Sequence, residues 1–276
     1  MTVNDEMKKL HNCHLIIANE IKRICNKHNI PYYIIAGTLL GAVRHNGFIP
    51  WDDDMDIGML REDYEKFISV AKDELGEEFF LQSFETDENY ALPFIKIMLN
   101  DTVLVERNTS GNSSKKGIYV DIFPFDNVPD SEAKRKIQNI KTYYLKRLFL
   151  AKQNYLIAKK GETAKAIVYK FLKFCSLFTT KKAIHSSLLK EMKRYNKTQT
   201  KKIVLFGGSY GYSKESVERE WFLKTVELPF EDTSFTAPYE YIKYLEYFYG
   251  DYKKLPPEDK RYNRHNVVEL DFGKYN

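Results

Sequence analysis

The stretch GTLLGAVRHNGFIPWDDDMDIGM, residues 37–59, carries the pattern that decides the fold. The residues before it, YYIIA at 32–36, are apolar and bounded by a proline and a glycine, which predicts a short buried strand. Residues 38–46 are predicted to form a short helix with Thr38 as its N-cap, followed by a turn. Acidic and apolar residues then alternate over residues 54–59, which is the periodicity of a strand with one polar face.

Two carboxylates on that polar face predict a metal site. Side chains two positions apart in a strand point the same way, so Asp54 and Asp56 are expected to share a face. Two ionised acids at this spacing repel each other, and a hard divalent cation such as Mg²⁺ or Mn²⁺ relieves that repulsion. Asp52 falls on the same face and Asp53 on the other, so the run alone does not identify the ligands, although the alternation favours Asp54 and Asp56. The alternative is an acidic loop solvated at a strand edge.

The segment before the acids adds a predicted phosphate site. Gly37 and Thr38 open a helix directly after a strand, where free backbone N–H groups and the helix dipole attract an anion, and Arg44 lies two turns farther along. A phosphate site beside a metal site is typical of phosphoryl or nucleotidyl transfer. Such chemistry predicts a third carboxylate. Asp121, between apolar neighbours in GIYVDIF, is the candidate, and the alternative is a surface acid on an edge strand.

Length and composition exclude several classes of protein. The chain has 276 residues, of which 43% are hydrophobic, 29% charged and 14% aromatic, so a disordered chain is excluded and one or two globular domains are expected. No uncharged stretch is long enough for a membrane-spanning helix, and the N-terminus lacks the apolar core of a signal peptide. The expected location is therefore the cytoplasm.

Charge is concentrated in one segment. Residues 131–202 contain 20 Lys and Arg but 3 Glu, about +17, whereas the rest of the chain holds 23 bases and 35 acids. Aromatic and aliphatic residues recur among these bases at helical spacing, as in a basic amphipathic helix. An anionic membrane surface or polyanionic acceptor and a solvated helical face remain open as interpretations. Nucleic acid is not expected, because no nucleic-acid-binding motif accompanies the charges.

Further elements follow from periodicity and turn signals. Helices are predicted at residues 4–28 and 63–73, strands at 94–99, 102–107 and 117–123, and an aromatic helix from Pro238 to about Gly250. Together with the first stretch, these elements predict an α/β core in which a mixed sheet is flanked by helices.

The sequence resembles the LicD family, phosphocholine transferases of bacterial surface glycans within the nucleotidyltransferase superfold. The resemblance lies in residues 37–59 and extends through FIKIMLNDTVLVE and YVDIFPFD to residues 206–222 and 227–265. The pattern of the superfold is a Gly-Ser pair at a strand end, two acids one residue apart and a later third acid, matched here by Gly37 and Thr38, by Asp54 and Asp56, and by Asp121. Thr38 replaces the commoner Ser, and the gap to Asp54 is longer than in many members of the superfold.

The resemblance implies a function and a division of the chain. We expect a nucleotidyltransferase-like catalytic core at 1–130, a basic helical insertion at 131–202 and a C-terminal part at 203–276 that packs on the core. The implied reaction moves phosphocholine from CDP-choline to a sugar hydroxyl of a teichoic acid, lipopolysaccharide or capsular glycan and releases CMP, with Mg²⁺ at the acids. Transfer of ribitol phosphate or glycerol phosphate from a CDP-activated donor is the nearest alternative. A non-catalytic basic adaptor at the inner face of the membrane and a nucleic-acid-associated nucleotidyltransferase are the others.

The resemblance also suggests donor contacts outside the acids. Lys96 is expected to touch a phosphate, with a strand lysine that reaches solvent as the alternative. Trp51 adjoins the acids, and an aromatic face suits a quaternary ammonium, although a core or rim aromatic is an equal interpretation. Tyr249 and His265 are further candidates. The glycines at 207, 208 and 211 are predicted to form a turn, because no Gly-Lys-Ser/Thr follows them.

Overall fold

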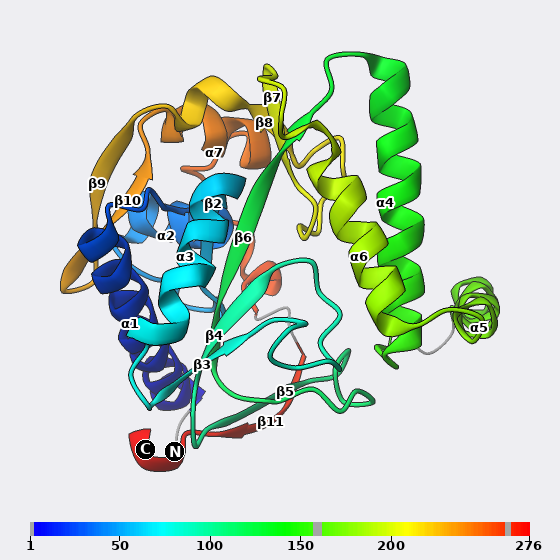
Figure 1. Cartoon of the computed structure of the whole chain (residues 1–276). Helices are drawn as coiled ribbons and strands as arrows, with labels where there is room; N and C mark the ends of the chain where they lie inside the picture. The colour runs from blue at the N-terminus through cyan, green and yellow to red at the C-terminus, as the bar shows by residue number, and fades with distance from the viewer. Residues whose placement is uncertain (1–2, 157–161, 263–265) are drawn as a thin grey trace.

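A seven-stranded sheet lies at the centre of the computed structural model, which describes residues 3–156, 162–262 and 266–276 (Figure 1). Its strands are β1 (Tyr33–Ile34), β2 (Asp56–Leu60), β3 (Phe79–Gln82), β4 (Ile95–Leu99), β6 (Tyr119–Val128), β7 (Lys202–Leu205) and β8 (Ser216–Glu218). They run in the order β1-β2-β6-β4-β3, and β7 pairs with both β6 and β8. Because β2 and β6 are parallel and the other pairs are antiparallel, the predicted mixed α/β sheet is confirmed.

Strand β6 is the central strand of this sheet, and all ten of its residues are buried. Its first half pairs with β2 on one side and with β4 on the other. Its second half, residues 125–128, pairs with β7. Strands β4 and β7 therefore follow each other along one edge of β6, and the side chain of Phe123 lies where the two pairings meet.

Helices cover the sheet. Helix α1 (Val3–His28) contacts α3 (Arg61–Glu74), and both contact β6, so these two helices pack on one face (Figure 1). Alternation along the strands sends fully buried apolar side chains, such as Ile57 and Ile122, to the opposite face from Asp56 and Asp121. Helix α2 (Ala36–His45) contacts β2 and α7 (Tyr241–Tyr249).

Two local predictions at residues 37–59 are wrong. The helix begins at Ala36, and the hydroxyl of Thr38 accepts a hydrogen bond from the Asp56 N–H at 2.8 Å, so Thr38 does not cap the helix. The strand begins at Asp56, and Asp54 lies in the loop before it. The first error arises because nothing in the local sequence shows that the Thr38 hydroxyl bonds to another element. The second arises because the alternation of acidic and apolar residues continues into the loop before the strand.

The predicted helix at 4–28 is confirmed, and the one at 63–73 lies within the longer α3. The predicted strands at 94–99 and 117–123 correspond to β4 and β6, and the one at 102–107 to β5 (Val103–Glu106), which pairs with β11 (Val267–Asp271) in a separate sheet. The aromatic helix α7 starts later than predicted, because Pro238 belongs to the hairpin of β9 (Thr225–Phe230) and β10 (Thr233–Pro238).

The basic segment is helical, as predicted. It forms α4 (Glu132–Lys152), α5 (Thr163–Ser176) and α6 (Lys181–Met192), followed by the short helix η1 (Lys193–Tyr195). Helix α4 contacts both α5 and α6, and Figure 1 shows the three on one side of the sheet with α5 outermost. Side chains of α4 and α6 share a hydrophobic cluster with Val128 of β6 and Val204 of β7. The remaining described elements are η2 (Arg219–Phe222), η3 (Glu258–Lys260) and η4 (Gly273–Tyr275).

None of the helices described in the structure combines the length and apolar content needed to cross a bilayer.

A buried ion pair joins the start of α3 to the far end of β6. The Arg61 guanidinium donates to both carboxylate oxygens of Asp126, at 2.8 and 2.6 Å, and these side chains are 7% and 0% exposed. Asn196, just after η1, donates to the same carboxylate at 2.6 Å. We expect Asp126→Ala to lower the free energy of unfolding by about 3–5 kcal/mol, because it leaves the Arg61 charge buried without its partner. Denaturant titration measures this loss.

The exposed pair of Glu132 and Lys136, separated by 2.9 Å, provides the control for that experiment. Because water solvates both of its charges, Glu132→Gln is expected to leave the unfolding midpoint unchanged. Equal midpoints for Asp126→Ala and Glu132→Gln would contradict the role given to the buried pair.

Candidate active site

A cavity of about 310 Å³ lies over the sheet at β2, β6 and β4. Its lining includes three of the predicted acids and the predicted lysine, namely Asp54, Asp56, Asp121 and Lys96. The rest of the lining includes aromatic rings from the sheet and from α7 and a glycine-containing loop after β7. An acidic side chain of β5 and an amide side chain from the turn after it also contribute. Polar groups therefore converge on a hollow that also has aromatic and aliphatic walls, a common form of small-molecule site.

Three charged side chains of this cavity stand in one row across neighbouring strands. Asp121 of β6 is in register with Asp56 of β2 on one side and with Lys96 of β4 on the other. Register partners on adjacent strands project from the same face of a sheet, and the strands lie about 4.8 Å apart. The sheet thus places side by side three residues that are far apart in the sequence.

Asp121 and Lys96 form a buried ion pair. The Lys96 Nζ lies 3.0 Å from the Asp121 Oδ1, and the two side chains are 8% and 11% exposed. The same ammonium sits over the ring of Tyr119, 3.0 Å from its centroid. Burial raises the pKa of Asp121 to about 6, while Lys96 opposes that rise. Asp121 is therefore a carboxylate that titrates close to neutral pH, a property common in catalytic groups.

The backbone around the acids is held by hydrogen bonds between elements. Thr38 accepts from the Asp56 N–H, the Ile35 N–H donates to the Asp56 carbonyl at 3.2 Å, and the Asp121 N–H donates to the Met55 carbonyl at 3.0 Å. Ile35 and Ala36, at the start of α2, also line the cavity. Helix α2 thus opens toward the acids, and Thr38 positions the strand that carries one of them.

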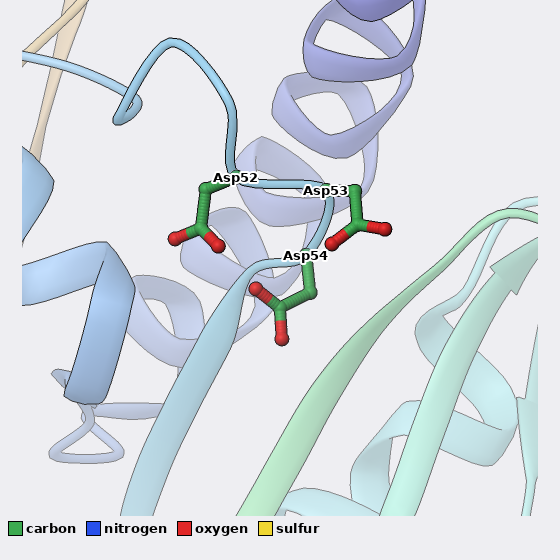
Figure 2. Close-up of side chains that lie close together, drawn as sticks. All are labelled: Asp52, Asp53 and Asp54. Atoms are coloured by element: carbon green, nitrogen blue, oxygen red, sulfur yellow. The ribbon is translucent and has the colours of Figure 1, made fainter. Parts of the chain in front are cut away.

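The acidic run forms a second cluster next to the cavity. Carboxylate oxygens of Asp52, Asp53 and Asp54 lie within 4.8 Å of one another, and Figure 2 shows them on the loop that leads into β2. A Cβ at position 37 would lie 2.5 Å from the Asp52 Oδ2, so Gly37 makes room for this cluster. Asp54 is the one acid that belongs to the cluster and also lines the cavity.

The donor set suits a hard cation. Both groups of acids offer carboxylate oxygens, the ligands that Mg²⁺ and Mn²⁺ bind in proteins. Asp54, Asp56 and Asp121 surround the cavity, whereas Asp52 and Asp53 do not line it. The residues present therefore fit a divalent ion, either in the cavity or at the cluster of Asp52, Asp53 and Asp54. Asp54 belongs to both groups.

The remaining predicted residues lie elsewhere. Gly37, Thr38, Arg44 and Trp51 do not line the cavity. The Arg44 guanidinium donates to the Tyr252 carbonyl at 3.2 Å, and the Trp51 ring lies edge-on to His45. His265 lies outside the described residues. The donor-binding role of all these residues stays a prediction.

Sequence reasoning missed several residues of the cavity wall. The glycines at 207 and 208 form a turn, as predicted, but this turn also lines the cavity together with Glu215, Tyr244 and Phe248. A Cβ at position 207 would lie 2.5 Å from the Phe94 ring, so glycine lets the turn approach the sheet. The available signal was the likeness of residues 206–222 to the LicD pattern, which marked the segment without assigning a role to its residues.

Comparisons with known proteins identify relatives of this chain. Residues 29–147 match the family model described as LicD/FKTN/FKRP, nucleotidyltransferase domain. The chain is 31% identical over 257 residues to the lipopolysaccharide cholinephosphotransferase LicD of Haemophilus influenzae, covering 91% of this chain and 92% of that protein. It is 53% identical over 47 residues to an uncharacterized protein of Rickettsia prowazekii, 17% of this chain and 18% of that one. It is 27% identical over 96 residues to mouse ribitol 5-phosphate transferase FKRP, 35% of this chain and 17% of that protein.

Proposed function

The chain belongs to the LicD family and is a phosphotransferase, and from this membership we propose that it moves phosphocholine from CDP-choline to a sugar hydroxyl of a bacterial cell-surface glycan, releasing CMP. Lipopolysaccharide, teichoic acid and capsule are the acceptor classes. The observation that carries the proposal is the row of Asp56, Asp121 and Lys96 in one cavity. The likeness of this chain to a lipopolysaccharide cholinephosphotransferase over nearly its full length also supports the proposal.

We also propose a nucleotidyltransferase-like core. The order of elements supports it: a short strand, a helix whose start lines the cavity, one acid just before β2 and one at its first residue, and a third acid on the parallel neighbour β6. The family model that matches residues 29–147 carries the same description.

In the proposed mechanism, Asp54 and Asp56 would hold Mg²⁺ or Mn²⁺, and Asp121 would offer a third carboxylate oxygen. When bound, this ion neutralises charge on the phosphates of the donor. Lys96 keeps a cation beside Asp121 and offers its remaining N–H groups to a phosphate oxygen. As a cavity carboxylate, Asp121 would also be the proposed acceptor of the proton that the sugar hydroxyl loses as it attacks phosphorus and CMP leaves.

The second candidate is transfer of ribitol phosphate or glycerol phosphate from a CDP-activated donor. The likeness to ribitol 5-phosphate transferase FKRP favours it, although it extends over only 35% of this chain. A non-catalytic adaptor is not favoured, because the charged residues that catalysis requires are held in one cavity.

A donor screen tests the proposal. We expect CMP release from CDP-choline in the presence of Mg²⁺ and a glycan acceptor, and little from CDP-ribitol, CDP-glycerol, CTP or ATP. Preference for CDP-ribitol or CDP-glycerol would establish the second candidate instead.

The acid limb of the pH profile should reflect Asp121. Its pKa is raised by burial to about 6, so the carboxyl is protonated below that pH and can neither bind a cation nor accept a proton. We expect kcat/KM to fall about tenfold for each pH unit below about 6, and the limb to move to lower pH as Mg²⁺ is raised, because metal and proton compete for the same oxygen. Rates measured from about pH 5 to 8 at two Mg²⁺ concentrations check this. A profile that stays flat down to pH 5 would contradict it.

We further propose that the enzyme is cytoplasmic and binds the inner face of the cell membrane through α5. Large apolar side chains at helical spacing are exposed on and just beyond this helix, with 68% exposure at Ile167 and 77% at Phe178. The others of this exposed face are Val168, Phe171, Phe174 and Leu177. Lys165, Lys170 and Lys173 lie on the same helix. An exposed apolar face bordered by lysines suits an anionic lipid surface.

Liposome co-sedimentation checks the membrane proposal. We expect the protein to bind vesicles containing phosphatidylglycerol more strongly than neutral vesicles, and added salt to weaken that binding, because each lysine near the surface contributes about 1 kcal/mol that salt screens. Replacing Phe171 and Phe174 together by Glu should abolish binding. Leu223→Glu, at an equally exposed apolar position outside the basic segment, is the control. Equal binding to neutral and anionic vesicles, or binding insensitive to salt, would reject the electrostatic part.

A further inference from the structure

The cavity of the acid row has a second group of side chains that the proposed mechanism leaves unused. Tyr244 and Phe248 reach it from α7, one turn apart on the helix, and Tyr210 reaches it from the loop after β7. Their rings form a continuous aromatic wall: the centroids of Tyr244 and Phe248 are 4.6 Å apart, and those of Tyr210 and Phe248 are 5.6 Å apart. Tyr244 is buried, whereas Tyr210 is 46% exposed and forms the rim.

A buried carboxylate belongs to the same group. Glu215 lines the cavity just before β8, is 6% exposed, and accepts a hydrogen bond from the Tyr210 N–H at 3.0 Å. A Cβ at position 208 would overlap its carboxylate, so Gly208 leaves the space that the acid occupies. Burial raises the pKa of Glu215 to about 7, against the lowering effects of the Tyr210 N–H and of Lys146. An anion in such surroundings is costly, and a cation bound beside it offsets that cost.

Aromatic rings next to one carboxylate match the chemistry of a quaternary ammonium. A trimethylammonium group has no N–H to donate, so it is recognised by aromatic faces and by an acid at van der Waals distance. A polyol such as ribitol or glycerol requires hydrogen-bonding partners for its several hydroxyls, and in this group of side chains only the two phenols and the Glu215 carboxylate can supply them. Tyr244 lines the cavity together with Glu215 and Asp56, and its pKa is raised by burial first and then by the charges of these two acids.

We infer that Tyr210, Tyr244, Phe248 and Glu215 form the subsite that holds the trimethylammonium group of the donor and selects choline over uncharged alcohols. This inference rests on the proposed function and deepens it. Trp51, the aromatic residue suggested by the sequence for this role, instead faces the guanidinium of Arg261 at 5.6 Å. The subsite is therefore built by the C-terminal part of the chain, whereas the acids come from its N-terminal half.

Calorimetric titration of the full chain in Mg²⁺ tests the subsite, with CDP-choline, CDP-glycerol and CMP as the three ligands. We expect the wild type to bind CDP-choline at least about tenfold more tightly than CDP-glycerol, the preference expected of a desolvated cation on aromatic rings. Glu215→Gln and Phe248→Leu should each reduce that preference several-fold while the affinity for CMP stays the same. Glu218→Gln, three positions along and paired with Lys202 at the surface, is the matched control and should change nothing.

The outcomes separate this inference from the proposed function. If Glu215→Gln weakens CMP and CDP-choline equally, Glu215 merely holds the loop at Tyr210 and the subsite is wrong. If the variants keep the wild-type preference while the wild type still releases CMP from CDP-choline, the subsite is wrong and the proposed function stands. If the wild type neither prefers nor consumes CDP-choline, both are overturned.

Discussion

Asp54→Asn and Asp56→Asn are each expected to lower kcat/KM for CMP release from CDP-choline by more than about 100-fold. Each change replaces a charged carboxylate of the cavity by an amide of the same size. If these acids hold the metal as proposed, losing one ligand costs at least ~3 kcal/mol of transition-state stabilisation. The fold should persist, because the Asp56 backbone keeps its bond to Thr38 and its pairing with Asp121. Steady-state kinetics with circular dichroism checks both parts.

Asp52→Asn tells the two acid groups apart. Asp52 belongs to the cluster with Asp53 and Asp54 but does not line the cavity. If the cation sits over the strand ends, this variant should keep most of its activity. A loss as large as that of Asp56→Asn would place the cation in the acidic run, and near-normal activity in Asp54→Asn or Asp56→Asn would remove that acid from the mechanism.

Asp121→Asn is expected to lower the transfer rate by a factor of ~100 to 10,000. Its two roles give different results. If Asp121 is mainly a ligand, the variant should bind Mg²⁺ more weakly and raised Mg²⁺ should recover part of the rate; if it is mainly a base, donor and Mg²⁺ should bind almost normally. We expect ligation to dominate, because Asp121 stands in register with Asp56. Calorimetry of Mg²⁺ and CDP-choline binding beside the rate decides between them.

Lys96→Met removes the cation that is paired with Asp121 and complements the Asp121→Asn experiment. Removing the ammonium leaves the Asp121 carboxylate buried without its cation, which should raise the pKa of Asp121 further and move the acid limb of the pH profile upward. Asp121→Asn should remove that limb. Full activity in Asp121→Asn would exclude Asp121 from the reaction altogether.

The sequence was sufficient to predict the acids and the strands that carry Asp56 and Asp121, because a period of two residues is a local signal. It could not predict that Lys96 pairs with Asp121, since that depends on strand register, which is set by packing across the whole sheet. The wall formed by Glu215 and Phe248 could not be predicted either, because it depends on how distant segments pack together. Thr38 was assigned to its own helix because a hydroxyl bonded to a strand 18 residues away leaves no local pattern.

The two walls of the cavity come from segments that the ribosome synthesises at different times. Asp56 and Asp121 precede the basic helices in the sequence, while the turn at Gly207 and the rings of α7 follow them. During synthesis at about 5–20 residues per second, the acids leave the ribosome on the order of 10 s before Phe248. For that interval the chain lacks the residues that form the other wall of the cavity. With the donor site proposed above, the enzyme is expected to gain its activity only at the end of translation, and a nascent chain that already holds every acid should not consume the donor.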